Sequence, residues 1–211
     1  TPQLMLSQRT RGNFARRVGE VADVAGVELR AGRPPEGAGT DKTPPPQPIK
    51  GSPLIFRTSF ETFRKTPTLH EEIFGPAVIV VVCESPAQLA DAAASIQGSL
   101  TGTIWAAGAD ESHARRLQRI LEQRVGRLIF NGVPTGVEVC AAMVHGGPYP
   151  ATNQSQSTAV GPMAMMRWCR PVCYQNVPEG FLPAELRNAN PLKIRRLVNG
   201  SWADDRTGAN A

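Results

Sequence analysis

Apolar residues near the start of the chain follow a helical spacing. Between Phe14 and Ala25 they recur every three or four residues, which is the spacing of one helix face. Charged side chains surround this stripe: Arg11, Arg16, Arg17 and Glu20. The pattern predicts an amphipathic helix within the first thirty residues, ended by Gly26 and Gly32.

From residue 54 onward, strand-like runs alternate with helical patterns. A capping box at Ser85, with proline next to it, predicts the start of one helix. Asp110 predicts the start of a second helix, which Gly126 closes. The strand-like runs are 54–56, 77–83, 101–107 and 127–130, and 77–83 has the composition of a fully buried strand. This order predicts an α/β fold with a mostly parallel sheet and helices on both faces.

Two segments lack this regularity. Residues 31–53 are rich in glycine and proline, which predicts loop or polyproline conformation. They fit a domain linker and a long surface excursion within one domain equally well. Residues 131–158 are long, irregular and dense in glycine and proline, and such segments at the edge of an α/β sheet are often functional.

The C-terminal part has its own pattern. Residues 158–168 predict a helix, and residues 169–175 predict a strand. Because Pro171 cannot donate to a ladder, this strand is expected at an edge or paired outside the domain. Residues 182–190 predict one more helix, which Pro191 ends.

Composition narrows the classes of protein. Hydrophobic residues make up 41% and charged residues 19%, which favours a packed core. No run approaches the roughly 18 apolar residues of a membrane helix, and no signal peptide pattern is present, so we expect a cytoplasmic protein without a membrane partner. The net charge of +5 is scattered along the chain, which favours a solvated basic surface over nucleic-acid binding.

Generic chemical motifs are missing. The four cysteines and three histidines lie at no metal-ligand spacing, so no metal site is expected and the thiols are expected to be reduced. The sequence also lacks a glycine-rich dinucleotide loop and a phosphate loop of its own.

One segment carries a family resemblance. Residues 69–76, Leu-His-Glu-Glu-Ile-Phe-Gly-Pro, resemble the signature of the NAD(P)-dependent aldehyde dehydrogenases, and an apolar strand follows as in that family. The resemblance implies that the Glu72 carboxylate binds the hydroxyls of the nicotinamide ribose and that the Phe74 ring packs beside it. Two vicinal hydroxyls suit one carboxylate, and a fixed ribose orients the ring for hydride transfer. The alternative for the two glutamates is an exposed acidic pair ahead of a turn.

The resemblance extends to about residue 200 in the family's order, and is weaker over the first sixty residues. Residues 132–143 resemble the loop that shapes the substrate pocket in this family. Residues 148–152 and 168–175 resemble the branch that contains the α-ketoglutaric semialdehyde and fatty aldehyde dehydrogenases. The substrate-pocket residues that this implies are Asn131, Val137, Cys140, His145, Gly146 and Gly147. His145 fits two roles, which are lining the pocket and bracing the loop through hydrogen bonds.

The resemblance also implies what the chain contributes. Residues 1–167 would be part of the catalytic domain, and 168–211 would be an oligomerisation strand and tail that build a homo-oligomer through 169–175. In the family the nucleophilic cysteine precedes the signature segment, and no cysteine precedes Cys83 here. The base glutamate and the cofactor domain of the family also have no match in this sequence. We therefore expect no catalytic residue and no activity in the chain alone. The implied substrate is an oxo-acid semialdehyde or an aliphatic aldehyde, with NADP or NAD as cofactor. A non-catalytic subunit-interaction module is the alternative.

Overall fold

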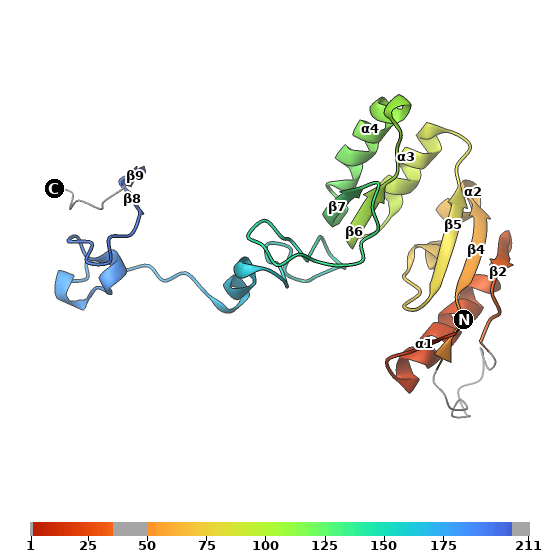
Figure 1. The fold of residues 1–211 in the computed structure, drawn as a ribbon, viewed down its shortest axis with the longest axis horizontal. Coiled ribbons are helices and arrows are strands. Elements are labelled where there is room, and N and C mark those ends of the chain that lie inside the picture. The colour runs from red at the N-terminus through yellow and green to blue at the C-terminus, as the bar shows by residue number, and fades with distance from the viewer. Residues whose placement is uncertain (1, 36–49, 204–211) are drawn as a thin grey trace. The chain divides into compact units, whose positions relative to one another are not determined.

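The computed structural model describes residues 2–35 and 50–203 (Figure 1). The chain divides into two compact units, Thr1–Arg167 and Trp168–Ala211. Most of the glycine- and proline-rich segment, including Pro44–Pro46, lies outside the described residues. The assignment of the second unit to oligomerisation stays a prediction.

The first helix follows the predicted stripe. Helix α1, Gln8–Ala22, begins after Ser7, whose hydroxyl accepts the Thr10 N–H, and it buries Phe14 and the apolar residues one and two turns later. It ends earlier than predicted. Gly26 adopts a positive φ of 86°, and strand β2, Val27–Ala31, follows where the sequence predicted helix. Pairing with a neighbouring strand therefore overrides the local helical pattern.

A three-stranded sheet forms the centre of the first unit. Its order is β2–β4–β5, with β4 spanning Leu54–Ser59 and β5 spanning Ala77–Val82. Strand β2 is antiparallel to β4, and β4 is parallel to β5 with Leu54 opposite Ala77. Helix α2, Phe60–Lys65, and the 3-10 helix η1, Pro67–His70, connect β4 to β5. Strands β1, Gln3–Leu4, and β3, Lys50–Gly51, form a short antiparallel pair.

The core of this sheet is apolar and continuous with α1. Its buried members are Phe14, Val18, Val21, Leu54, Phe56, Phe63, Leu69 and Ile73. Because these residues come from α1, β4, α2, η1 and the segment before β5, burying them fixes the position of all five segments together.

Two parallel strands and two helices follow. Helix α3 spans Pro86–Ser95 and helix α4 spans Glu111–Leu121, and the two pack against each other (Figure 1). Strand β6, Ser99–Ile104, is parallel to β7, Val125–Phe130. The predicted cap before α3 is present in a modified form: the Ser85 hydroxyl accepts the Gln88 N–H at 3.2 Å, and the Gln88 side chain accepts the N–H of Glu84, one residue before the N-cap, at 2.8 Å.

The α/β class is confirmed, but the described strands do not form one continuous sheet. Strands β5 and β6 are not paired with each other, so β6 and β7 form a sheet of their own. Strand β5 was predicted to be fully buried, and this prediction is wrong: Val78 and Val80 are 51% and 44% exposed. Their neighbours Ile79 and Val81 pack on the core, so only one face of this apolar strand is covered.

The second unit differs from its predictions. Residues 169–175 form no strand, because a strand needs a partner ladder and the described part of the chain offers them none. The predicted helix 182–190 is wrong. Only the 3-10 turns η4, Glu179–Phe181, and η5, Ala184–Leu186, occur in this region. The helix predicted over 158–168, which lies almost entirely in the first unit, is instead the 3-10 helix η3, Pro162–Trp168.

A hairpin that was not predicted from the sequence lies in the last described residues of the second unit. Strands β8, Arg196–Val198, and β9, Ser201–Ala203, are antiparallel and joined by Asn199 and Gly200. Both joining residues have positive φ, 50° and 81°, which suits an Asn-Gly pair in a two-residue hairpin loop.

Replacing Phe56 tests the core. Phe56→Ala removes a ring that is 0% exposed, so we expect the free energy of unfolding to fall by about 3–5 kcal/mol in urea titrations. The matched control Ile55→Ala, one position along β4 and 40% exposed, should cost about 1 kcal/mol or less. Equal losses for the two variants would contradict the assigned faces of β4.

Candidate functional site

The segment with Glu72 and Phe74 lies between η1 and β5. Ile73 is buried in the core, whereas Glu72 is exposed and Phe74 is 63% exposed. The extended backbone thus places the middle residue inward and both neighbours outward. Among the described residues, the Glu72 carboxylate makes no hydrogen bond or ion pair, which leaves its oxygens available to a ligand.

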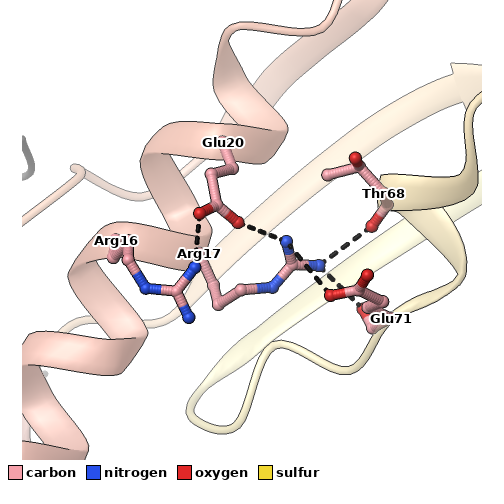
Figure 2. Close-up of polar contacts among 5 residues, drawn as sticks. All are labelled: Arg16, Arg17, Glu20, Thr68 and Glu71. Carbon is pink, nitrogen blue, oxygen red and sulfur yellow. Dashed lines mark hydrogen bonds and ion pairs between the residues drawn. The ribbon is translucent and has the colours of Figure 1, made fainter.

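Helix α1 anchors the start of this segment through Arg17 (Figure 2). The Nη2 atom of Arg17 donates to the carbonyl oxygens of Thr68 at 2.9 Å and Glu71 at 3.2 Å. The Nη1 atom pairs with the Glu20 carboxylate at 2.5 Å and lies 3.7 Å from the Glu71 carboxylate. The hydrogen bond from Arg17 holds the pKa of Glu20 below its ordinary value, so this carboxylate stays ionised and paired.

The end of the segment rests on the same helix. A Cβ atom on Gly75 would lie 2.4 Å from the ring of Phe14 in α1, so only glycine allows this approach. Leu54 at the start of β4 also donates its N–H to the Pro76 carbonyl at 2.9 Å. The backbone of residues 71–76 is therefore held at both ends while Glu72 and Phe74 remain exposed.

The His145-Gly146-Gly147 segment packs at the amino ends of β6 and β7. A Cβ atom on Gly126, in β7, would meet the Gly146 carbonyl at 2.1 Å, and a Cβ atom on Gly147 would meet the Ser99 carbonyl at 2.6 Å. The absence of side chains on these glycines is thus required for backbone-to-backbone contact.

The backbone of His145 braces this loop, and its ring lines a small cavity. The His145 N–H donates to the buried Thr158 hydroxyl at 2.8 Å, and its carbonyl accepts the Ala159 N–H at 2.9 Å. Within the described part of the chain, the ring Nδ1 atom is buried without a hydrogen-bond partner. The cavity has a volume of about 250 Å³, and its lining also includes Arg167. The role of the ring stays a prediction.

The other pocket residues lie on the loop that follows the carboxyl end of β7. Asn131 has a positive φ of 47°, and its side-chain amide pairs with both the N–H and the carbonyl of Ala106, at 2.9 and 3.0 Å. Val137 and Cys140 are partly buried in the same loop. None of these three lines the cavity beside His145, so the structure does not gather the six predicted pocket residues into one site.

A larger cleft of about 540 Å³ was not predicted from the sequence. It lies at the carboxyl ends of β5 and β6, and its lining includes Cys83, Trp105 and His113. Burial raises the pKa of the Cys83 thiol, which opposes formation of a nucleophilic thiolate. The position was foreseeable, because ligands of α/β sheets bind at carboxyl ends of strands. It includes none of the predicted site residues.

Within residues 2–35 and 50–203, no group of three or more histidine, cysteine, aspartate or glutamate side chains is placed to hold a metal ion. No helix in the same ranges is long and apolar enough to cross a membrane.

Comparisons with known proteins give sequence relatives but no matching family model. The chain is 40% identical over 198 residues to α-ketoglutaric semialdehyde dehydrogenase 2 of Azospirillum brasilense, and 39% identical over 201 residues to the α-ketoglutaric semialdehyde dehydrogenase of Acinetobacter baylyi. These alignments cover 93% and 94% of the chain but 36% of each relative. The chain therefore spans about a third of the length of these relatives.

Solved structures share the fold. The Δ-pyrroline-5-carboxylate dehydrogenase of Mycobacterium tuberculosis matches 85% of the chain and 32% of its own length, with a TM-score of 0.56 and 18% identity. Betaine aldehyde dehydrogenase of Staphylococcus aureus in complex with NAD+ matches 78% of the chain and 30% of its own length, with a TM-score of 0.55 and 18% identity. At this identity the likeness concerns the fold.

Thr158 gives a test of the brace around His145. Thr158→Val leaves the His145 N–H without its acceptor, so we expect a loss of about 1–3 kcal/mol of unfolding free energy. Thr135→Val, at an exposed position of the preceding loop, is the control and should change stability by about 0.5 kcal/mol or less. Urea titrations that find the two variants equally stable would argue against the brace.

Proposed function

Because this chain is a segment of the aldehyde dehydrogenase family, we propose that it forms part of an enzyme that oxidises an aldehyde to a carboxylic acid with NAD+ or NADP+. Its own contribution is to hold the nicotinamide ribose with Glu72 and to pack Phe74 beside it. The observation that carries this proposal is the anchored segment 71–76, in which the partner-free Glu72 carboxylate and the Phe74 ring are exposed on either side of the buried Ile73.

The residues present suit a ribose. Its vicinal hydroxyls supply two donors, and the exposed Glu72 carboxylate supplies two acceptor oxygens for a charge-assisted contact. Burial of Ile73 limits the freedom of both neighbours, so little ordering is required on binding. A bound nicotinamide supplies hydride-accepting chemistry. The ribose next to it is common to NAD+ and NADP+, so a contact through Glu72 does not select between them.

In the aldehyde dehydrogenase family, the nucleophilic cysteine precedes the signature that residues 69–76 resemble. No residue of this chain matches the family's attacking cysteine. Cys83 is partly buried and its pKa is raised, and Cys140 lies on the loop after β7. We therefore expect the 211-residue chain alone to bind cofactor weakly and to oxidise no aldehyde.

A carboxylated semialdehyde is the proposed substrate class. The two sequence relatives are named for α-ketoglutaric semialdehyde, whose chemistry combines an aldehyde with carboxylate charge. Arg167 lines the cavity beside His145, so a cation and an imidazole are available there for an anionic substrate group. An uncharged aliphatic aldehyde would leave this cation without a function in binding.

The cofactor contact is testable on the chain itself. On addition of β-nicotinamide mononucleotide, the backbone amide NMR shifts of residues 71–75 should move. Glu72→Gln should weaken this binding about tenfold, because hydrogen bonds to charged groups contribute about 1.5–3 kcal/mol. Glu122→Gln, at the exposed residue that directly follows α4, is the matched control and should bind as the original protein does. Shifts confined to other segments, or an unchanged affinity of Glu72→Gln, would refute the ribose contact.

A subunit-interaction role is the second proposal, and it is compatible with the first. Residues 169–175 lie in no described helix or strand, and Trp168, Val172 and Tyr174 are exposed. Exposed apolar side chains on an unpaired segment favour contact with the sheet edge of another copy.

Sedimentation velocity tests this pairing. We expect the chain to self-associate, and Val172→Lys should shift it toward monomer because a charge replaces an apolar contact. Val198→Lys, an exposed apolar position on β8, is the control and should leave association unchanged. A monomeric chain at tens of micromolar would count against the interaction role.

A further inference from the structure

The guanidinium of Arg17 is buried although the sequence pattern placed it among the charged residues around the apolar stripe. The residue is 7% exposed, and an arginine at such a position requires partners for its charge and its N–H groups. Figure 2 shows these partners: the Glu20 carboxylate on the same helix, the backbone carbonyl groups of Thr68 and Glu71, and the Glu71 carboxylate.

The contacts of Arg17 lie at the turn directly before Glu72. One nitrogen, Nη2, bridges the carbonyl oxygens of Thr68 and Glu71 at 2.9 and 3.2 Å. The turn's own hydrogen bond, from the Glu71 N–H to the Thr68 carbonyl, is longer at 3.4 Å. The two hydrogen bonds from Arg17 are therefore shorter than the hydrogen bond within the turn. One of their acceptors is the carbonyl of Glu71, the residue next to Glu72.

Arg16 provides the internal comparison. Its guanidinium pairs with the same Glu20 carboxylate, but its side chain is 60% exposed and makes no hydrogen bond or ion pair with the described residues 68–76. The two arginines thus share an ion-pair partner and differ in the contact with the turn. An exposed pair of this kind contributes little to stability.

We infer that Arg17 is a positioning residue for the nicotinamide ribose: it fixes the Glu71 backbone and thereby aims the Glu72 carboxylate. This inference rests on the proposed ribose contact of Glu72. A lysine cannot replace Arg17 in this role, because one ammonium group lacks the planar array of N–H groups that reaches two carbonyls and a carboxylate at once. Lysine would keep the positive charge but lose the hydrogen bonds to both carbonyl groups, so Arg17→Lys distinguishes an effect of these hydrogen bonds from an effect of charge.

Hydrogen exchange and ligand binding test the inference together. Arg17→Lys keeps the ion pair with Glu20, so the fold should be retained, while amides 71–75 should exchange about tenfold faster because local opening becomes easier. The same variant should bind β-nicotinamide mononucleotide about tenfold more weakly, as measured by the NMR shifts at residues 71–75. Arg17→Met is the stronger form of the change, and Arg16→Gln is the control, expected within twofold of the original protein in both readouts.

The outcomes separate two kinds of failure. Unchanged exchange at residues 71–75 in Arg17→Lys, or faster exchange with unchanged nucleotide affinity, would overturn the positioning role and leave the ribose contact standing. No nucleotide-induced shift at residues 71–75 in the original protein would instead overturn the proposed function, and the positioning role with it. Faster exchange and weaker binding in Arg17→Lys, with Arg16→Gln unchanged, is the result that supports the inference.

Discussion

The packing of α1 against the first sheet is the contact on which the candidate site depends. Phe14 and Val18 fill the core beneath β4, Gly75 lies against the Phe14 ring, and Arg17 holds the turn before Glu72. One helix thereby supplies apolar burial and polar anchoring to the same short segment. Because burial of these side chains provides most of the stabilisation, the positions of Glu72 and Phe74 follow from the core itself.

Elsewhere in the first unit, apolar surface and a strand edge are left uncovered by the described residues. Strand β5 has the apolar composition of a strand buried on both faces, yet Val78 and Val80 are exposed and no described strand pairs with its edge toward β6. The chain spans about a third of the length of its sequence relatives. The predicted pocket residues are correspondingly divided, with His145 at the amino ends of β6 and β7 and Asn131 at the carboxyl end of β7.

Helices were predicted well where packing and capping agree. The stripe around Phe14 and the capping box at Ser85 each combine a buried face with a local hydrogen bond, so local sequence determines them. Strand β2 and residues 169–175 depend on a partner elsewhere, which local patterns do not report. Glu72 and Phe74 were found only through a family resemblance, and Arg17 was missed because a helical arginine beside an apolar stripe ordinarily faces solvent.

The exposed side chains of residues 72–74 are proposed to receive a nicotinamide ribose. Transferred NOE measurements with β-nicotinamide mononucleotide and the 211-residue chain test this contact directly. We expect cross-peaks between the Phe74 ring protons and the ribose protons, and we expect them to disappear in Glu72→Gln. Cross-peaks that instead join the nucleotide to Trp105 or His113, in the cleft at the carboxyl ends of β5 and β6, would contradict it.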